Sequence, residues 1–375
     1  MSTGSTNPFK FGSDIAKGEY FADREKEIKE LKQQLKDGAR IVLFAARRYG
    51  KTALIMNVLD GLASEKHLTA YFDVSTAPDK SLFVSKYKSL FVKAGSKEWF
   101  LGWAKKNLPK IKVSLGDVEI DLSGLSDSDL DLAFDKILDL PEQLGNSKGR
   151  VIVALDEFHE IRSLDSEQTE KLLRSKLQFH KNVSYIFSGS RFHVLQNMFE
   201  TPGSPFYKSA KMWELQRIPK EAYANFIVHR FKKTGIEVDK THVDEILSKT
   251  DSHTYFTQQL CHELWDVCRV RQHSTVKDED MSAAITQVIA NQSAVYEKTW
   301  EDLSGGYKKL VIGILKLGGH QVWSQAFKKE TRLSDGAIEK GIRYATEQYL
   351  IDKDSSGNYY IPDLFFREWL KKKLQ

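Results

Sequence analysis

The segment 45–52, AARRYGKT, carries the residue types and spacing best suited to chemistry. A loop that holds phosphate needs inward-pointing backbone N–H groups, a lysine that reaches the phosphates and a hydroxyl that binds Mg²⁺. Gly50, Lys51 and Thr52 supply these parts in the order of a P-loop, in which Ala45 replaces the first glycine. Alanine resists positive φ, so we expect an altered loop entrance or a reduced nucleotide affinity. The residues expected to contact nucleotide are Ala46, Arg47, Arg48, Tyr49, Gly50, Lys51, Thr52 and Ala53.

Two carboxylates, Asp156 and Glu157, follow the apolar run at 150–155. This pattern is typical of a Walker B strand, in which the aspartate holds Mg²⁺ and the glutamate activates the attacking water. Thr52 and Asp156 are therefore the predicted metal ligands. Glu157 favours turnover over nucleotide binding alone, the alternative being a purely structural acid. His159 is expected to be a surface or helix-start residue and not a catalyst.

A third polar group, residues 188–191, SGSR, ends the strand predicted at 182–189. Arg191 is the preferred member, because a guanidinium beside the γ-phosphate would stabilise charge on the transferred phosphoryl group. The alternative is an ordinary arginine at the end of a strand. Two contacts stay open for Arg47 and Arg48: one with phosphate and one with an adjoining protein segment.

The elements around these residues predict a parallel sheet. Strands are expected at 40–45 and 69–75, with a helix from 53 to 63 between them, and a β-α-β order implies a parallel sheet covered by helices. The carboxyl ends of such strands meet at one edge, so Lys51, Asp156 and Arg191 should face a single site.

An insertion interrupts this pattern between about 97 and 145. Ile111, Val113 and Leu115 alternate with polar residues, as do Val118, Ile120 and Leu122. Gly116-Asp117 between them predicts a hairpin with a two-residue turn.

The composition bounds the class of protein. A chain of 375 residues suggests two or three compact units, and 41% hydrophobic with 29% charged residues excludes a disordered chain. No apolar run reaches the ~18 residues of a membrane helix, and the first residues lack the apolar core of a secretory signal, so we expect a cytoplasmic protein with no membrane partner. Cys261 and Cys268 are expected to be reduced core thiols. The net charge of +5 permits an anionic partner without requiring one.

Helical patterns replace strands from about 212 onward. Amphipathic helices are expected at 221–235 and 258–270, followed by helices at 307–319 and 334–348 and a hairpin at 350–362. The last three have the order of a winged helix-turn-helix.

The predicted winged helix is only mildly basic. Residues 296–375 hold 14 Lys plus Arg and 11 Asp plus Glu, a net charge of +3. Lys340 and Arg343 are suited to phosphate contacts, whereas Glu339 and Glu347 on the same helix would be repelled by DNA. DNA binding and docking to a protein both remain open.

The motifs together resemble the archaeal-type ATPases, a branch of the STAND class within the AAA+ superfamily that is also similar to the origin-recognition ATPases. The resemblance covers nearly the whole chain. The segments that carry it are an N-terminal box at 7–31, the P-loop, the Walker B segment at 151–161, the sensor strand at 185–191, the segment 204–210 and a lid motif at 250–265.

The resemblance implies an α/β fold, in which a P-loop AAA+ parallel-sheet core is joined to an α-helical lid and a C-terminal winged helix. The implied domains are a core at 1–211 with the insertion at about 97–145, a lid at 212–295 and a winged helix at 296–375. It also implies that Phe21 and Arg24 contact the base, and that His253 and Tyr255 at the lid motif sense nucleotide. In that motif Ser252 and Thr254 replace the usual Gly and Pro. The alternative to a sensing role for His253 is that it serves as a plain helix-cap residue.

These inferences predict a Mg²⁺-dependent ATPase that acts as a nucleotide-driven conformational switch. ATP and ADP are the expected ligands, and the γ-phosphate is expected to be sensed by Lys51, Arg191 and His253. The alternatives are a DNA-binding winged-helix protein regulated by ATP, and a ligand-activated signalling or defence scaffold with little turnover. A protein partner or self-association is compatible with each of these.

Overall fold

The chain folds into two compact units in a computed structural model. The first comprises Ser13–Ile218, and the second comprises Pro219–Gln375 together with Met1–Gly12. The structure describes residues 6–12, 18–45, 47–108, 112–113, 120–121, 126–164, 166–354 and 356–374.

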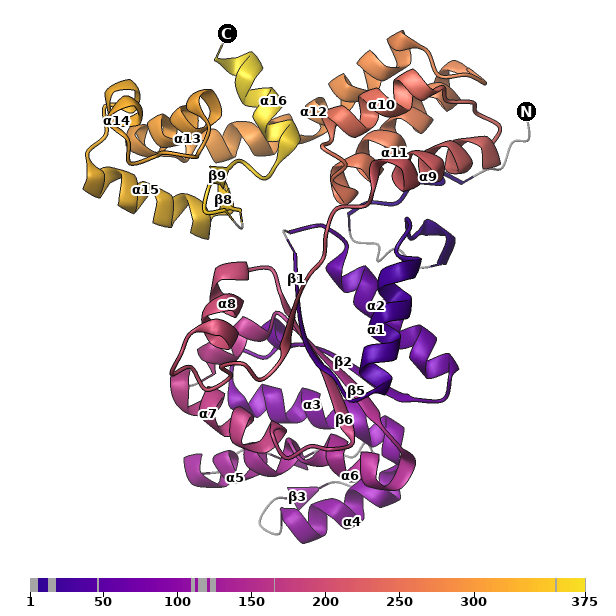
Figure 1. Ribbon diagram of the computed structural model, residues 1–375, viewed down its shortest axis with the longest axis vertical. Coiled ribbons are helices and arrows are strands. Elements are labelled where there is room, and N and C mark those ends of the chain that lie inside the picture. The colour runs from indigo at the N-terminus through magenta and orange to yellow at the C-terminus, as the bar shows by residue number, and fades with distance from the viewer. Residues whose placement is uncertain are drawn as a thin grey trace. The chain divides into compact units, whose positions relative to one another are not determined.

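A five-stranded parallel sheet forms the centre of the first unit (Figure 1). Its order is β2-β5-β6-β1-β7. The strands are β1 (Arg40–Phe44), β2 (Leu68–Asp73), β5 (Val151–Asp156), β6 (Val183–Gly189) and β7 (Lys211–Glu214). Four of them lie where the sequence predicts strands, and β5 and β6 are buried along their whole length, as strands covered on both faces must be. The fifth, β7, lies beyond the point where the strands were expected to stop.

Helices cover both faces of this sheet. On one face α1 (Glu25–Lys36) and α2 (Lys51–Ser64) bury apolar side chains against β1, β5 and β6. The elements on the other face are α3 (Lys80–Gly95), α5 (Asp127–Ile137), α6 (Leu140–Lys148), η3 (Phe158–Ser163), α7 (Ser166–Leu177) and α8 (Phe192–Glu200). The carboxyl ends of β1, β5 and β6 are thereby held rigidly beneath the loops that follow them.

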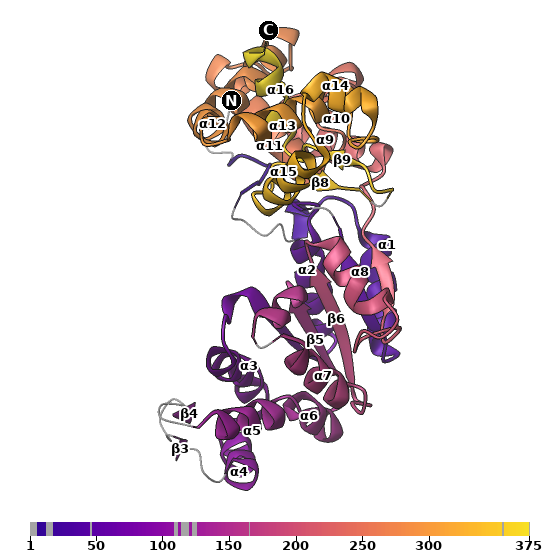
Figure 2. The same cartoon turned by 90° about the vertical axis from the view of Figure 1, so that its left-hand side faces the viewer.

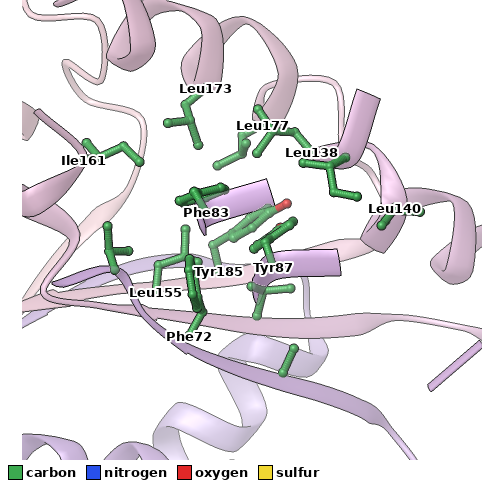
Figure 3. Close-up of a cluster of buried hydrophobic side chains, with 14 of the residues drawn as sticks. Phe72, Phe83, Tyr87, Leu138, Leu140, Leu155, Ile161, Leu173, Leu177 and Tyr185 are labelled. Atoms are coloured by element: carbon green, nitrogen blue, oxygen red, sulfur yellow. The ribbon is translucent and has the colours of Figure 1, made fainter. Parts of the chain in front are cut away.

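The second face is packed with aromatic side chains. In Figure 3 Phe72 of β2 lies against Phe83 and Tyr87 of α3, with Tyr185 of β6 beside them. The ring centroids of Phe72 and Phe83 are 5.0 Å apart, and those of Phe83 and Tyr87 are 5.3 Å apart. Each such pair adds about 1 kcal/mol beyond the burial of its area.

The insertion is largely helical. It contains α4 (Lys97–Asn107), α5 and the start of α6, and Figure 2 shows these helices, with the preceding α3, grouped beside a short hairpin. In that hairpin β3 (Lys112–Val113) pairs antiparallel with β4 (Ile120–Asp121), in the register 112↔121 and 113↔120. The predicted turn at Gly116-Asp117 lies outside the described residues, as do Ile111, Leu115, Val118 and Leu122.

The second unit is built from helices. It contains α9 (Lys220–Lys233), α10 (Lys240–Lys249), α11 (Thr254–Arg271) and α12 (Asp278–Glu301), which form the lid. Cys261 and Cys268 are buried, unpaired members of α11, which confirms the expected core thiols. Burial, together with the neighbouring Asp280, raises the pKa of Cys268 to about 12.

A winged region follows the lid. It consists of α13 (Gly305–Leu317), α14 (Gln325–Thr331), α15 (Asp335–Glu347), the hairpin of β8 (Asp352–Lys353) and β9 (Tyr359–Tyr360), and α16 (Leu364–Lys373). The side chains of Ser304, Ser324 and Ser334 cap the N-termini of α13, α14 and α15, so these three helices begin at the same kind of residue. The helix α14 was not expected from the sequence pattern.

The N-terminal residues 6–12 pack on the lid helices. Phe9 is 1% exposed, and its ring lies 4.8 Å from that of Phe231 in α9. The buried guanidinium of Arg230 donates to the carbonyl oxygen of Pro8 at 2.6 Å, and His262 of α11 contacts the carbonyl oxygen of Phe9 at 2.8 Å. A segment far away in sequence is therefore part of this unit's core.

In the part of the chain that the structure describes, no helix combines the length and apolar character required to cross a membrane.

Candidate nucleotide-binding and catalytic site

The loop between β1 and α2 has the backbone of an anion-binding turn. Gly50 precedes the first residue of α2 with φ +85°, and Arg48 also has positive φ, at +64°. Lys51 and Thr52 form the first turn of α2, whose N–H groups and dipole favour an anion at this end. Ala46 lies outside the described residues.

Asp156 is the centre of a buried polar cluster at the carboxyl end of β5. Its Oδ2 accepts hydrogen bonds from Thr52 Oγ1 and from Tyr71 OH of β2, both at 2.9 Å. Its Oδ1 accepts a hydrogen bond from Ser188 Oγ of β6 at 2.5 Å and lies 3.7 Å from Lys51 Nζ. Three strands and the P-loop helix thus converge on one carboxylate.

The surroundings of Asp156 keep it ionised. Burial alone would raise its pKa, but the charge of Lys51 and the hydrogen bonds from Ser188, Tyr71 and Thr52 outweigh burial and hold the pKa below its usual value. Burial, followed by the charge of Asp156, raises the pKa of Tyr71. The tyrosine therefore stays protonated and continues to donate.

Glu157 lies beside this cluster and is 27% exposed at its side chain. Its backbone is left-handed, with φ +47°, at the point where β5 ends and η3 begins. One carboxylate oxygen, Oε1, lies 3.7 Å from Lys51 Nζ. The other, Oε2, accepts hydrogen bonds from Ser190 N at 3.0 Å and Ser190 Oγ at 3.1 Å.

Of the two positions expected for His159, at the surface or at a helix start, the structure shows the second: His159 is buried and is the second residue of the short helix η3. Its Nδ1 lies 3.4 Å from Glu157 Oε2 and its Nε2 lies 3.1 Å from Glu160 Oε1. Burial lowers the pKa of His159, against the opposing effect of the two glutamates, and the charges of Arg191 and Lys51 add to the lowering.

The arginines of the site are on its exposed side. Arg191 immediately precedes α8, and its charge acts on His159, which places it at the same edge of the sheet as Glu157. Arg47 and Arg48 are exposed in the P-loop, and Tyr49 OH accepts a hydrogen bond from Arg217 at 3.0 Å.

Phe21 and Arg24, the predicted base contacts, lie at the entry to α1. Phe21 packs against the same apolar cluster as Tyr49, over α2. Arg24 is 3% exposed and donates from one nitrogen to Glu27 Oε1 at 2.7 Å, while its buried NH2 nitrogen has no hydrogen-bond partner among the residues that the structure describes. An unpaired buried donor suits an acceptor atom of a bound base.

His253 and Tyr255 belong to the other unit. His253 precedes α11 at the N-cap position, but its side chain makes no capping hydrogen bond, and its ring lies 4.6 Å from that of Phe256. Asp251 and Ser252 before it both have positive φ, at +51° and +52°.

Tyr71, Ser188 and Ser190 are site residues that were not singled out from the sequence. Ser188 and Ser190 were seen as part of the 188–191 group, yet Arg191 was preferred, whereas Ser188 contacts Asp156 and Ser190 contacts Glu157 directly. Tyr71 stands two residues before the end of β2, the strand beside β5, and polar residues at the ends of neighbouring strands are the signal that would have found it.

The donor set fits a magnesium ion. The Thr52 hydroxyl, the Asp156 carboxylate and the Ser188 hydroxyl are oxygen donors within one buried cluster, and Mg²⁺ prefers such ligands together with water and phosphate oxygens.

If the five strands of the parallel sheet are numbered 1 to 5 along the chain, the sheet order β2-β5-β6-β1-β7 becomes 2-3-4-1-5. This order, with a P-loop after β1 and an Asp-Glu pair at the end of β5, defines a P-loop ATPase core of the AAA+ type. The family model described as an ATPase domain predominantly from Archaea matches residues 21–260, and the chain belongs to this family. Nucleotide binding is the shared property of such ATPase domains. A comparison with curated proteins gave no significant match.

Solved structures share the fold along nearly the whole chain. A Walker-type ATPase of Pyrococcus abyssi is 17% identical with a TM-score of 0.66, and 95% of this chain covers 97% of that one. The ORC2 protein of Aeropyrum pernix, solved with ADPNP and ADP, is 14% identical with a TM-score of 0.56, and 97% of this chain covers all of that one (100%). The ORC1 protein of Aeropyrum pernix, solved in complex with DNA, is 12% identical with a TM-score of 0.53, at 95% and 94% coverage. These likenesses confirm the parallel-sheet core, the helical lid and the C-terminal winged region.

Proposed function

We propose that this protein hydrolyses ATP to ADP and phosphate in a Mg²⁺-dependent reaction. The observation that carries the proposal is the position of Lys51 Nζ, 3.7 Å from both Asp156 Oδ1 and Glu157 Oε1. A phosphate-binding cation, a metal-binding carboxylate and a second carboxylate suited to activate water are thus brought together. A protein that only bound nucleotide would not require the second carboxylate.

The proposed reaction assigns one task to each group. Lys51 and the N–H groups at the start of α2 bind the β- and γ-phosphates. Glu157 accepts a proton from water as the water oxygen forms a bond to the γ-phosphorus, and the bond from that phosphorus to the bridging oxygen of ADP breaks. Arg191 stabilises the negative charge on the transferred phosphoryl group. Phe21 and Arg24 bind the base.

Thr52 and Asp156 would hold the metal ion, with Ser188 and Tyr71 fixing the orientation of the Asp156 carboxylate. When bound, Mg²⁺ supplies neutralisation of the phosphate charge.

Steady-state phosphate release from ATP with Mg²⁺ tests the proposal. Glu157→Gln is expected to lower kcat by roughly 100-fold or more while a fluorescent ATP analogue still binds, since the variant loses a general base and keeps the phosphate-binding groups. Lys51→Ala is expected to lose both binding and turnover. Glu200→Gln, an exposed glutamate on α8, is the matched control and should behave as wild type. Wild-type protein that binds nucleotide but releases no phosphate above the Lys51→Ala background contradicts the proposal.

We also propose that bound ATP acts as a conformational switch, in which the lid helices α9–α12 and the winged region that follows them respond to the γ-phosphate through Lys51, Arg191 and His253. The left-handed pair Asp251-Ser252 before α11 supports a role for this segment, because strained backbone is common at ligand clamps and switches. Hydrogen exchange of α11 and α15 with ATP and with ADP tests the switch. Equal exchange in the two states contradicts it.

DNA binding through the winged helix is the second candidate function. The likeness to a protein solved with DNA and the exposed Lys340 and Arg343 on α15 favour it. Against it, Arg343 lies 3.6 Å from Glu339 on the same exposed face, so part of its charge is already balanced. Salt-dependent binding to duplex DNA that is lost in Lys340→Ala and Arg343→Ala supports this function, whereas ATP-dependent self-association without DNA binding supports a signalling scaffold.

A further inference from the structure

The two oxygens of the Glu157 carboxylate have different surroundings. Oε2 accepts two hydrogen bonds from one residue, from the backbone N–H of Ser190 at 3.0 Å and from its hydroxyl at 3.1 Å. Oε1 accepts neither of them and faces Lys51 Nζ at 3.7 Å. One oxygen is therefore anchored, and the other is directed at the group that holds phosphate.

The anchoring residue is itself held firmly. Ser190 comes directly after β6, a strand buried from end to end. Gly189 before it packs closely: a Cβ at this position would lie 2.9 Å from His159 Nδ1 and 3.1 Å from Leu195 Cδ1. The end of β6 and the start of η3 consequently approach each other at a point where only a glycine fits, and this brings Ser190 to Glu157.

The backbone at Glu157 needs such support. A left-handed φ of +47° is unfavourable for a residue with a long side chain, and the strain is tolerated where surrounding contacts fix it. The hydrogen bond from Glu160 N to the Glu157 carbonyl oxygen, at 2.9 Å, fixes the main chain. The two hydrogen bonds from Ser190 fix the side chain.

We propose that Ser190 is a positioning residue for ATP hydrolysis, which holds Oε2 of Glu157 so that Oε1 is the oxygen that receives the proton of the attacking water. Lys51 Nζ lies 3.7 Å from this same oxygen, so a phosphate bound by Lys51 would lie close to the proposed base. The inference rests on the proposed hydrolysis and on Glu157 as its base. Ser190 keeps its own proton throughout, and the proton accepted by Oε1 passes to solvent after phosphate has formed.

An unanchored carboxylate would sample several rotamers, only some of which direct an oxygen at the water. Effective general-base catalysis depends on geometry within hydrogen-bond reach, so loosening the carboxylate lowers the chemical rate and leaves the affinity for nucleotide unchanged. The backbone N–H of Ser190 remains in any side-chain variant, so the expected loss is partial.

The kinetic test uses Ser190→Ala and the conservative Ser190→Thr in the full chain. Ser190→Ala is expected to lower kcat by about 10-fold, with KM and the Kd of a fluorescent ATP analogue within about twofold of wild type. Ser190→Thr keeps the hydroxyl and is expected to restore kcat to within about threefold. Ser89→Ala is the matched control, because its hydroxyl donates to the carbonyl oxygen of Ser85 on an exposed face of α3. An unchanged or increased kcat in Ser190→Ala overturns the inference, and an increase would show that Ser190 restrains Glu157 in an inactive position.

A second readout separates this inference from the proposed function. In a double-mutant cycle of urea unfolding, Ser190→Ala is expected to lower the midpoint in the wild-type background and to leave it unchanged in a Glu157→Ala background. Equal shifts in both backgrounds overturn the anchoring contact even if ATP is hydrolysed. Absence of turnover in the wild type, with coupling intact, would refute the hydrolysis and with it the role of Ser190 in catalysis, while the contact itself would stand.

Discussion

Asp156 shows how a buried charge is made tolerable by its neighbours. A carboxylate with 3% exposure would be costly unless it were paired and hydrogen-bonded, and here Thr52, Tyr71 and Ser188 donate to it while Lys51 supplies the opposite charge. The same contacts hold the carboxylate in one orientation. The features that stabilise the charge therefore also preorganise the proposed metal site.

Removal of one donor from this cluster is expected to destabilise the first unit. Ser188→Ala deletes the 2.5 Å hydrogen bond to Asp156 Oδ1 at a fully buried position. Hydrogen bonds to charged groups contribute about 1.5–3 kcal/mol, so we expect the free energy of unfolding to fall by about 2 kcal/mol, as measured by urea denaturation. Ser89→Ala on the surface of α3 should change it by less than about 0.5 kcal/mol. A loss no larger than that of the control would show that water replaces the serine hydroxyl.

The sequence allowed the P-loop and the two carboxylates to be predicted, because their chemistry lies in consecutive residues. Tyr71 could not be found in this way: its contact with Asp156 depends on β2 lying beside β5, and strand order is set by packing across the sheet. Ser190 was visible as a residue, but its contact with Glu157 depends on the close approach permitted by Gly189. Contacts between residues of different elements, such as these two, could be identified only from the structure.

The helices and strands likewise divide into those that a local sequence pattern predicts and those that it does not. Strands β5 and β6 were predicted because they are continuous apolar runs, whereas β7 is a short edge strand with exposed ends and a mixed composition. Its place in the sheet is determined by pairing with β1 and not by an apolar pattern. Likewise α14, of only seven residues, is too short to show a helical period.

The junction between α11 and α12 depends on one buried aspartate. Asp280 has no exposed surface and accepts hydrogen bonds from Arg271 NH1 and His273 Nδ1, each at 2.9 Å, and from Lys277 N at 3.1 Å. Burial alone would raise its pKa, but the hydrogen bonds from His273 and Arg271 outweigh burial and lower it.

Asp280→Asn is expected to lower the free energy of unfolding of the second unit by about 1.5–3 kcal/mol at pH 7, because the hydrogen bonds from Arg271 and His273 lose their charged acceptor. A depressed pKa stabilises the folded state above the unfolded value of about 3.9, and this contribution is lost as pH falls towards the folded pKa. Urea unfolding should therefore show that the free energies of unfolding of Asp280→Asn and wild type differ by the same amount at pH 7 and pH 5. At pH 3.5 this difference should be smaller. Glu279→Gln, exposed in the same turn, should show little difference at any pH. A difference that grows towards low pH contradicts this assignment.

The end of α11 offers a stabilising substitution. Gln272 follows the last residue of this helix with φ +57°, a conformation that glycine adopts without strain. Gln272→Gly is expected to raise the free energy of unfolding by about 0.5–1 kcal/mol. The same change at Gln287, exposed in the middle of α12, should lower it by a similar amount, because glycine is unfavourable within a helix. Thermal unfolding followed by circular dichroism measures both, and shifts of the same sign would contradict the backbone argument.

The chain passes between its two units more than once. Residues 1–12 belong to the unit that contains the lid, Ser13–Ile218 form the unit that contains the sheet, and the chain then returns at Pro219. The second unit is therefore assembled from segments separated by about two hundred positions of sequence, and its folding requires the N-terminal segment to find α9 and α11. Each unit nevertheless has a hydrophobic core of its own.

Substitutions in each core should separate the stabilities of the two units. Phe9→Ala removes a ring that is 1% exposed and packs on Phe231, and Phe83→Ala removes a fully buried ring from the aromatic cluster beside β2. Each is expected to cost about 3–5 kcal/mol in its own unit. Differential scanning calorimetry should show two transitions, of which Phe9→Ala lowers one and Phe83→Ala lowers the other. Hydrogen exchange identifies them, since Phe9→Ala should increase exchange in α9 and α11 and leave β5 and β6 protected. A single transition that both variants shift equally would show that the units unfold as one cooperative body, and the separate cores would then be coupled through the two chain crossings.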